Sequence, residues 1–89
     1  MCVVSLRGRD AGHIFYVVGE SPGRVLVADG RLHSTRRPKA KNPRHLRALA
    51  RSTDAIDAWA RAGAVPMDHE LRRELESLEI RDEGGTEDL

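Results

Sequence analysis

The sequence is poor in cysteine and aromatic residues, and it has no long apolar run. Its single cysteine, Cys2, excludes an internal disulfide and any metal site built from several cysteines, which fits a reducing compartment. Aromatic residues make up 3% of the chain, too few for a platform of several stacked rings. The longest apolar run, 14–18, is far too short to cross a membrane. We therefore expect a cytoplasmic protein with no leader and no membrane partner.

Patterns typical of enzymes and metal sites are also missing. The four histidines lack the spacing of a metal site. Ser5 and Asp10 have no evident partner for nucleophilic catalysis, and no glycine-rich loop ends in Lys-Ser or Lys-Thr. We therefore expect no enzymatic activity, no metal, no cofactor and no small-molecule substrate.

The formal net charge of +1 hides a strong asymmetry between the two halves of the chain. Residues 1–51 carry eleven lysines and arginines against three acidic residues, whereas residues 52–89 carry four arginines against eleven acidic residues. Such a division points to a nucleic-acid-binding basic half and an acidic half that stays away from it. We expect electrostatic repulsion to hold the acidic helices away from the basic face.

Residues 3–18 contain two apolar runs joined by a short charged loop. Both runs are rich in β-branched and aromatic residues, so they predict two strands, and adjacent Phe15 and Tyr16 should point to opposite faces of the sheet. Gly8 and Gly12 tolerate positive φ and let the backbone approach a ligand closely. With Arg7 and Arg9 beside them, that ligand is expected to be anionic, although a solvated hairpin loop remains the alternative.

Further short strands should follow. A turn at 19–23 precedes an apolar strand at 24–28. Asp29-Gly30 is a strong hairpin signal and predicts an antiparallel return over 31–36, followed by an exposed basic connector at 37–41. Four or five short strands in so few residues predict a small SH3-like barrel, because closure protects their edges.

The second half has helical periodicity. Asn42 should cap a first helix that begins at Pro43 and buries one face. The residues of that face are Leu46, Leu49, Ala50 and Thr53. A second helix, capped by Ser52, Thr53 or Asp54, should place Ile56 and Trp59 on one face and end at Gly63.

A third helix should begin at Met67 or Asp68, with an acidic first turn and a leucine stripe. The stripe consists of Leu71, Leu75 and Leu78. We thus expect a mainly β fold with an α extension of two to three helices. Its parts are a barrel at 1–41, a helical extension at 42–81 packed on or beside the barrel, and an acidic flexible tail at 82–89.

Residues 3–18 resemble a KOW motif, in which an apolar strand, a basic loop and a glycine form the RNA-contacting corner of an SH3-like barrel. Gly12 stands at the motif glycine, whereas His13 stands where a basic residue is common. Residues 25–31 and 37–46 extend the likeness. The chain is similar to small bacterial KOW-domain RNA-binding proteins related to a large-subunit ribosomal protein of eukaryotes and archaea, the fourteenth of its series.

This resemblance covers residues 2–46 and implies non-catalytic RNA binding, with ribosomal RNA and the ribosome or a translation factor as partners. The expected RNA-binding residues are Arg7, Gly8, Arg9, Gly12, Arg31, Arg36, Arg37, Lys39, Lys41, Arg44 and Arg47. Planar guanidinium groups suit phosphate contacts. The alternative is a protein-interaction module that docks onto a ribosome- or transcription-associated partner through Trp59 and the leucine stripe.

Overall fold

The computed structural model describes the backbone of residues 1–87 and the side chains of residues 1–79. The strands are β1 (Cys2–Ser5), β2 (Ile14–Ser21), β3 (Arg24–Ala28), β4 (Lys39–Lys41) and β5 (Leu46–Ala48). A 3-10 turn, η1 (Pro43–His45), lies between β4 and β5, and the helices α1 (Asp54–Ala62) and α2 (Asp68–Glu87) follow. The chain is thus mainly β with a helical extension. No helix in this described part is long and apolar enough to span a bilayer.

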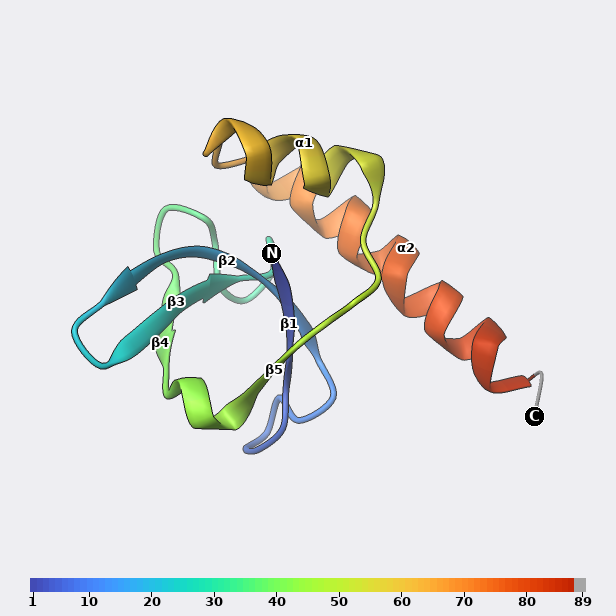
Figure 1. Cartoon of the computed structure of the whole chain (residues 1–89), viewed down its shortest axis with the longest axis horizontal. Coiled ribbons are helices and arrows are strands. Elements are labelled where there is room, and N and C mark those ends of the chain that lie inside the picture. The colour runs from blue at the N-terminus through green and yellow to red at the C-terminus, as the bar shows by residue number, and fades with distance from the viewer. Residues whose placement is uncertain (88–89) are drawn as a thin grey trace.

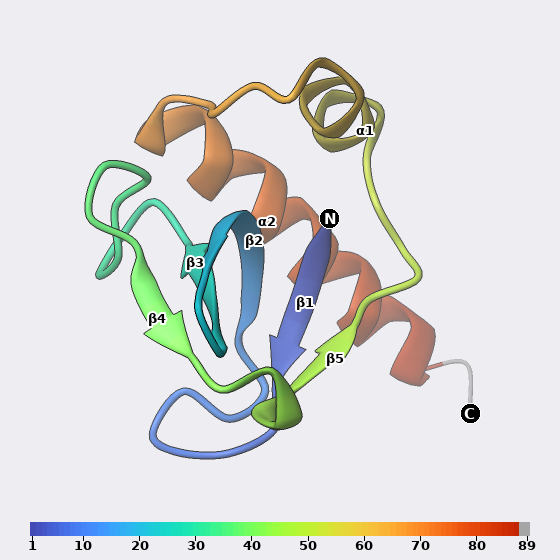
Figure 2. The same cartoon turned by 60° about the vertical axis from the view of Figure 1, so that its left-hand side comes forward.

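The five strands form one antiparallel sheet in the order β4-β3-β2-β1-β5. If the sheet were flat, its edge strands β4 and β5 would stand roughly 19 Å apart. The short segment 42–45 nevertheless joins them, and a 3-10 turn advances only about 2 Å per residue. The sheet must therefore curl so that its two edges approach each other, which can be followed in Figure 2.

Both faces of the curled sheet are apolar, and the two predicted aromatic orientations are confirmed. Phe15 packs on the inner face with Val3 and Val27. Tyr16 packs on the outer face. Buried partners on that outer side are Cys2, Ile14, Ala28, Ile56, Leu71, Leu75 and Leu78. Helices α1 and α2 cover the outer face (Figure 1), so sheet and helices share one core.

Helix α1 begins and ends at predicted positions, and α2 begins at one of the two predicted starts. Thr53 caps α1 by accepting a hydrogen bond of 3.1 Å from the Ile56 amide, and Gly63 ends the helix with a φ of 64°. Helix α2 begins at Asp68, and its leucine stripe is fully buried against the sheet. The tail predicted at 82–89 lies outside the described side chains, and only its backbone through Glu87 is assigned, as part of α2.

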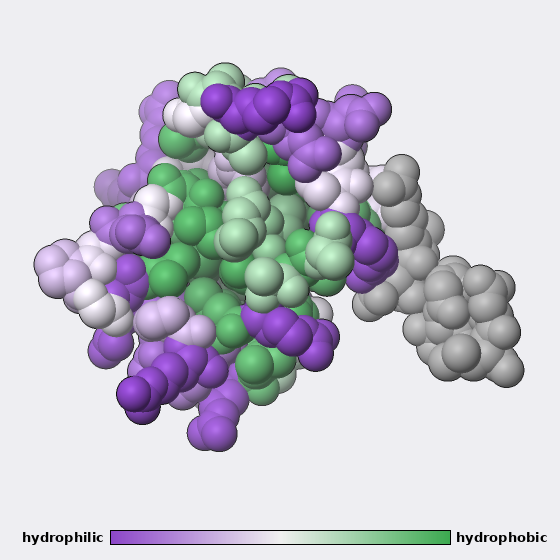
Figure 3. Space-filling model, viewed as in Figure 1, coloured by the Kyte–Doolittle hydropathy of each residue, from purple (hydrophilic) through white to green (hydrophobic). Residues whose placement is uncertain are grey.

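Trp59 joins α1 to the sheet. Its ring meets the ring of Tyr16 edge-on, with centroids 6.0 Å apart, and the Tyr16 hydroxyl donates to the Ala64 carbonyl at 3.4 Å. In the view of Figure 3, apolar residues gather in the middle, whereas hydrophilic ones lie mostly toward the rim. Trp59 therefore helps to dock α1 onto the sheet.

The predicted first helix is wrong. Asn42 does act as a cap, accepting a hydrogen bond from the Arg44 amide at 2.9 Å, but the helix it caps is only the 3-10 turn η1. The chain then extends as β5, where Val3 pairs with Ala48 on the free edge of β1. Because unpaired strand edges attract partners, this pairing overrides the helical periodicity of the segment.

The predicted strand at 31–36 is also wrong. Asp29 Oδ1 accepts hydrogen bonds from the Arg31 and His33 amides, at 2.9 and 3.0 Å, and these bonds close a compact loop. Asp68 at the start of α2 accepts from the Thr35 amide at 2.8 Å and ties that loop to the helix. The strand that pairs with β3 on the side away from β2 is instead β4, within the segment predicted to be an exposed connector.

Candidate nucleic-acid interface

The loop between β1 and β2 has the backbone geometry predicted from its glycines. Gly8 and Gly12 have φ values of 87° and 88°. The Gly12 amide donates to the Ser5 carbonyl at 2.7 Å, and the Ala11 amide donates to the Gly8 carbonyl at 3.1 Å. A Cβ atom added at Gly12 would have no heavy atom within 4 Å. The loop is therefore tightly turned, and its backbone at Gly12 faces open space.

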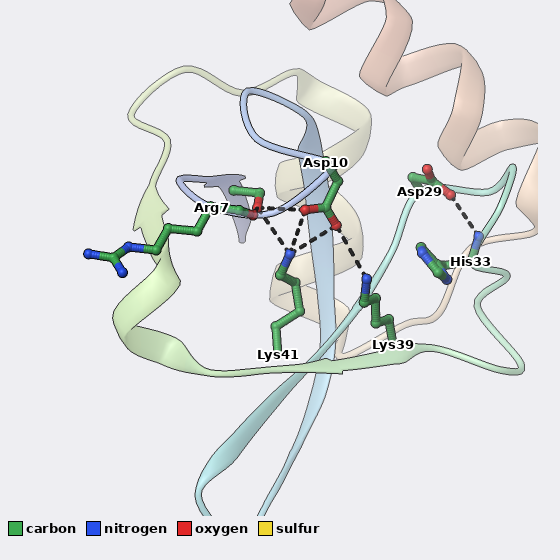
Figure 4. Close-up of polar contacts among 7 residues, drawn as sticks. Arg7, Asp10, Asp29, His33, Lys39 and Lys41 are labelled. Atoms are coloured by element: carbon green, nitrogen blue, oxygen red, sulfur yellow. Dashed lines mark hydrogen bonds and ion pairs between the residues drawn. The ribbon is translucent and has the colours of Figure 1, made fainter.

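Within this loop, Asp10 lies in a cluster of charged and polar groups (Figure 4). Lys41 Nζ lies 2.8 and 2.9 Å from its two carboxylate oxygens, and Lys39 Nζ lies 3.6 Å from Oδ2. Burial raises the pKa of the Asp10 carboxyl. Hydrogen bonds from Lys41 and Ser5, with the charges of Lys41 and Lys39, outweigh burial and lower that pKa from 3.8 to about 2.

Lys41 is therefore engaged inside the protein. Its side chain is only 8% exposed, its ammonium group lies 3.0 Å from Ser5 Oγ, and it stands 5.6 Å from the centre of the Phe15 ring. Lys39 keeps a side chain that is 44% exposed. Of the two lysines in the predicted RNA-binding set, Lys39 can reach a ligand, whereas Lys41 holds β4 to the loop.

Three predicted arginines come together around η1. The Leu6 amide donates to the His45 carbonyl at 2.8 Å, which places Arg7 beside the turn that carries Arg44. Arg47 follows on β5, in register with Val4 of β1. All three arginines are exposed. Figure 4 shows the Arg7 side chain pointing away from the Asp10 cluster, so it is free to meet a ligand.

Three other predicted cations line a pocket of about 550 Å³, which Asp10 also lines. Arg9 comes from the β1–β2 loop, Arg31 from the loop after β3, and Lys39 from β4. In the view of Figure 4, Lys39 lies between Lys41 and His33. Helix α2 closes the pocket, and other lining residues include Asp29, Leu32, His33, Arg72, Leu75, Glu76 and Glu79.

Arg36 and Arg37 are not among the residues that line this pocket. Arg36 lines a separate hollow with Pro66 and Met67, and both arginines are exposed. Their backbone amides are fixed by Ser34 Oγ, at 3.2 and 3.1 Å. The predicted RNA-binding residues therefore form one group around η1, one group around the pocket, and this outlying pair.

The acidic half does not stand away from the basic half, so the prediction of electrostatic separation is wrong. Glu76 and Glu79 of α2 line the same pocket as Arg9 and Lys39. Burial of the leucine stripe accounts for this placement, because each buried leucine contributes about 1.5–3 kcal/mol. Repulsion could not have operated in any case, because the facing charges have opposite signs.

Sequence reasoning missed two kinds of pocket residue. Arg72 was counted with the acidic half, although α2 carries it to the rim beside Arg31. His33 was assigned to a strand, whereas its ring lies in the loop with its centroid 6.2 Å from that of Phe15. The helical period predicts that Arg72 lies at the border of the buried leucine stripe, and this was the sequence signal for its position.

No model of a known protein family matches the chain, and no curated protein matches its sequence. The likeness of residues 2–46 to KOW proteins therefore remains an expectation based on sequence.

Proposed function

We propose that this protein binds structured RNA, without catalysis, through phosphate contacts from the β1–β2 loop and the adjoining η1 and β5. One observation carries the proposal: the exposed arginines of the basic half lack counter-charges. Among the described residues, none of these guanidinium groups makes an ion pair, while Asp10, the acid of the β1–β2 loop, is already paired with two lysines. Seven of these arginines belong to the predicted RNA-binding set: Arg7, Arg9, Arg31, Arg36, Arg37, Arg44 and Arg47. Arg24, at the start of β3, is equally exposed but lies away from the β1–β2 loop.

The fold supports the same proposal. The antiparallel order, the return of β5 to β1 and the curl of the sheet are what we expect of the SH3-like barrel that the KOW resemblance implies. Positive φ at Gly12, in the position of the motif glycine, leaves the backbone open to a phosphate. The expected RNA is ribosomal, and the expected compartment is the cytoplasm, where a single unpaired cysteine persists.

Structured RNA fits this surface better than a single strand read by stacking. Phe15 and Tyr16 are buried, and Trp59 is packed on Tyr16. Few rings are therefore offered to stack on successive bases, which is how single strands are usually held. Exposed arginines suit the phosphates and the shape of a folded RNA.

The alternative, a protein-docking module, needs an exposed surface made of Trp59 and the leucine stripe, but these side chains pack inside the protein. Leu71, Leu75 and Leu78 are at most 3% exposed, because they pack on the chain's own sheet. Trp59 is half-buried against Tyr16. A partner would have to displace the core in order to reach these side chains.

The direct test compares two double charge reversals in filter binding to ribosomal RNA at low salt. We expect Arg7→Glu with Arg9→Glu to weaken binding at least tenfold, because the paired reversal removes two phosphate contacts and adds repulsion. The matched control, Arg24→Glu with Arg61→Glu, makes the same change in net charge at exposed positions away from the loop. No binding by the unaltered protein, or equal losses in both variants, would overturn the proposal.

A further inference from the structure

The pocket beside the β1–β2 loop combines an apolar floor with a charged rim. Ile14, Phe15 and Leu75 belong to the buried core and reach the floor of the pocket, and Leu32 adds an apolar side chain that is 87% exposed. The volume of about 550 Å³ falls within the range of roughly 300–1,000 Å³ typical of small-ligand pockets. A flat stretch of RNA backbone would leave this hollow empty.

The cations on the rim are available to an anion. Among the described residues, Arg9, Arg31 and Arg72 make no ion pair, and Lys39 has only the 3.6 Å contact with Asp10. These four side chains come from the β1–β2 loop, the loop after β3, helix α2 and strand β4. One phosphate at the mouth would therefore meet donors from separate parts of the fold.

The same rim carries carboxylates. Their negative charge repels a run of several phosphates, but their oxygens can accept hydrogen bonds from a base. Glu76 and Glu79 have no ion pair among the described residues. Asp29 uses Oδ1 for two backbone amides, while no hydrogen bond within the described part engages its Oδ2. Carboxylate oxygens accept hydrogen bonds from the amino and imino groups at a base edge. The apolar floor, the cations and the acceptors together match the flat face of a base, a phosphate and the hydrogen-bonding edge of that base.

We propose that this pocket holds a single unpaired nucleotide of the bound RNA, with its phosphate against Arg9, Arg31 and Arg72. This inference rests on the proposed RNA-binding function and adds to it a specific site for one unpaired nucleotide. Arg9 links the two surfaces, because the β1–β2 loop that carries it also carries Arg7 of the phosphate-binding group. An RNA lying along the loop can therefore place a neighbouring extruded base in the pocket.

The preferred RNA is one that already has an unpaired base. Extruding a base from a continuous duplex costs a few kcal/mol, and the cost is smallest for a base that is already unpaired. The protein should therefore bind an RNA hairpin with one bulged adenosine about tenfold more tightly than the same hairpin without the bulge. That factor corresponds to one charge-assisted contact together with burial of part of the base.

The test measures the affinity of the full chain for both hairpins by fluorescence anisotropy. Arg72→Ala should abolish the preference for the bulged hairpin while changing the affinity for the continuous hairpin less than twofold. Arg73→Ala is the matched control, because Arg73 is exposed on the same helix and does not line the pocket. We expect it to keep the preference.

Leu32→Ala is the second arm and changes no charge. Leu32 is 87% exposed, so its loss should leave folding intact and reduce the preference for the bulge about threefold. Val65→Ala, at an exposed apolar residue outside the pocket, should not change the preference.

Equal binding of both hairpins by the unaltered protein, or equal effects of Arg72→Ala and Arg73→Ala, would overturn the proposed nucleotide pocket and leave the RNA-binding proposal standing. Binding to neither hairpin would overturn both proposals.

Discussion

Lys41 on β4 and Asp10 in the β1–β2 loop form an ion pair with oxygen contacts of 2.8 and 2.9 Å. Three strands separate β4 from β5 in the sheet, yet this pair joins β4 to the loop that begins at the end of β1. The ion pair therefore fastens the curl of the sheet at the candidate interface. It also keeps Asp10 from neutralising Arg7 and Arg9, which precede it in the loop.

Asp10→Asn should destabilise the protein by about 3 kcal/mol, because it leaves the Lys41 ammonium group buried without a counter-charge. Chemical denaturation measures the loss. Adding Lys41→Met to Asp10→Asn should recover part of it, since the unpaired charge is then gone. Strictly additive losses in the two single variants and the double variant would show that the two residues are not coupled.

The Lys41–Asp10 ion pair also predicts that the free energy of unfolding decreases at low pH. The pKa of folded Asp10 is about 2, below the ordinary value of 3.8, so the unfolded chain binds the proton first as the pH falls. The stabilisation is fully present above about pH 5 and is lost progressively as the pH falls through 3.8 and below 2, on the order of 1–2 kcal/mol after allowing for partial solvent screening. Asp10→Asn should show a shallower loss over this range in urea titrations. An identical slope would contradict the assignment.

Gly30 should tolerate a side chain far less well than Gly12. Both have positive φ, but a Cβ atom at Gly30 would collide with the Asp68 carbonyl and lie 3.1 Å from the Arg72 amide. Thermal unfolding should show a loss of about 1 kcal/mol for Gly12→Ala, from backbone strain alone. Gly30→Ala should cost about 3 kcal/mol or more, because α2 must move. Equal losses would mean that α2 does not approach the loop this closely.

Salt should weaken RNA binding in proportion to the number of phosphate contacts. With about five contacts, the log-log slope should be roughly −3.5 for a single strand and −4.5 for a duplex. Arg7→Gln should make the slope shallower by about 0.7–0.9, whereas Arg24→Gln should leave it unchanged. A slope near zero for the unaltered protein would count against phosphate contacts.

Gly12→Val tests whether the loop backbone meets the RNA. The site is open, so the valine methyl groups would project into the space that a bound phosphate needs. We expect at least a tenfold loss in affinity for ribosomal RNA in filter binding, beyond any effect of the strained backbone on folding. Gly23→Val is the matched control, with a φ of 71° and equally open surroundings on another loop. Unchanged affinity in Gly12→Val would remove the loop from the interface.

Local signals in the sequence were sufficient where local interactions decide the structure. Helix α1 begins after Thr53 and ends at Gly63, and Asn42 caps η1, because capping involves only neighbouring residues. The strand–loop–strand unit at 3–18 was equally readable from its apolar runs and its two glycines.

The sequence-based predictions failed where the structure of a segment depends on a partner that is distant in the chain. Leu46 and Leu49 have helical spacing, but residues 46–48 pair with the open edge of β1, which the local sequence cannot reveal. Lys41 looked like a solvated loop residue because its partner, Asp10, lies far away along the chain. The pocket depends on how α2 lies across the sheet, so the role of Arg72 emerges only from the assembled fold.

The shared core on the outer face of the sheet also determines when the protein can fold. Cys2, Ile14 and Tyr16 are covered by Leu71 and Leu75, which are synthesised much later. During translation, the strands leave the ribosome with an apolar face exposed until residues 71–78 have followed. We therefore expect the sheet to gain its full packing only after α2 has been synthesised.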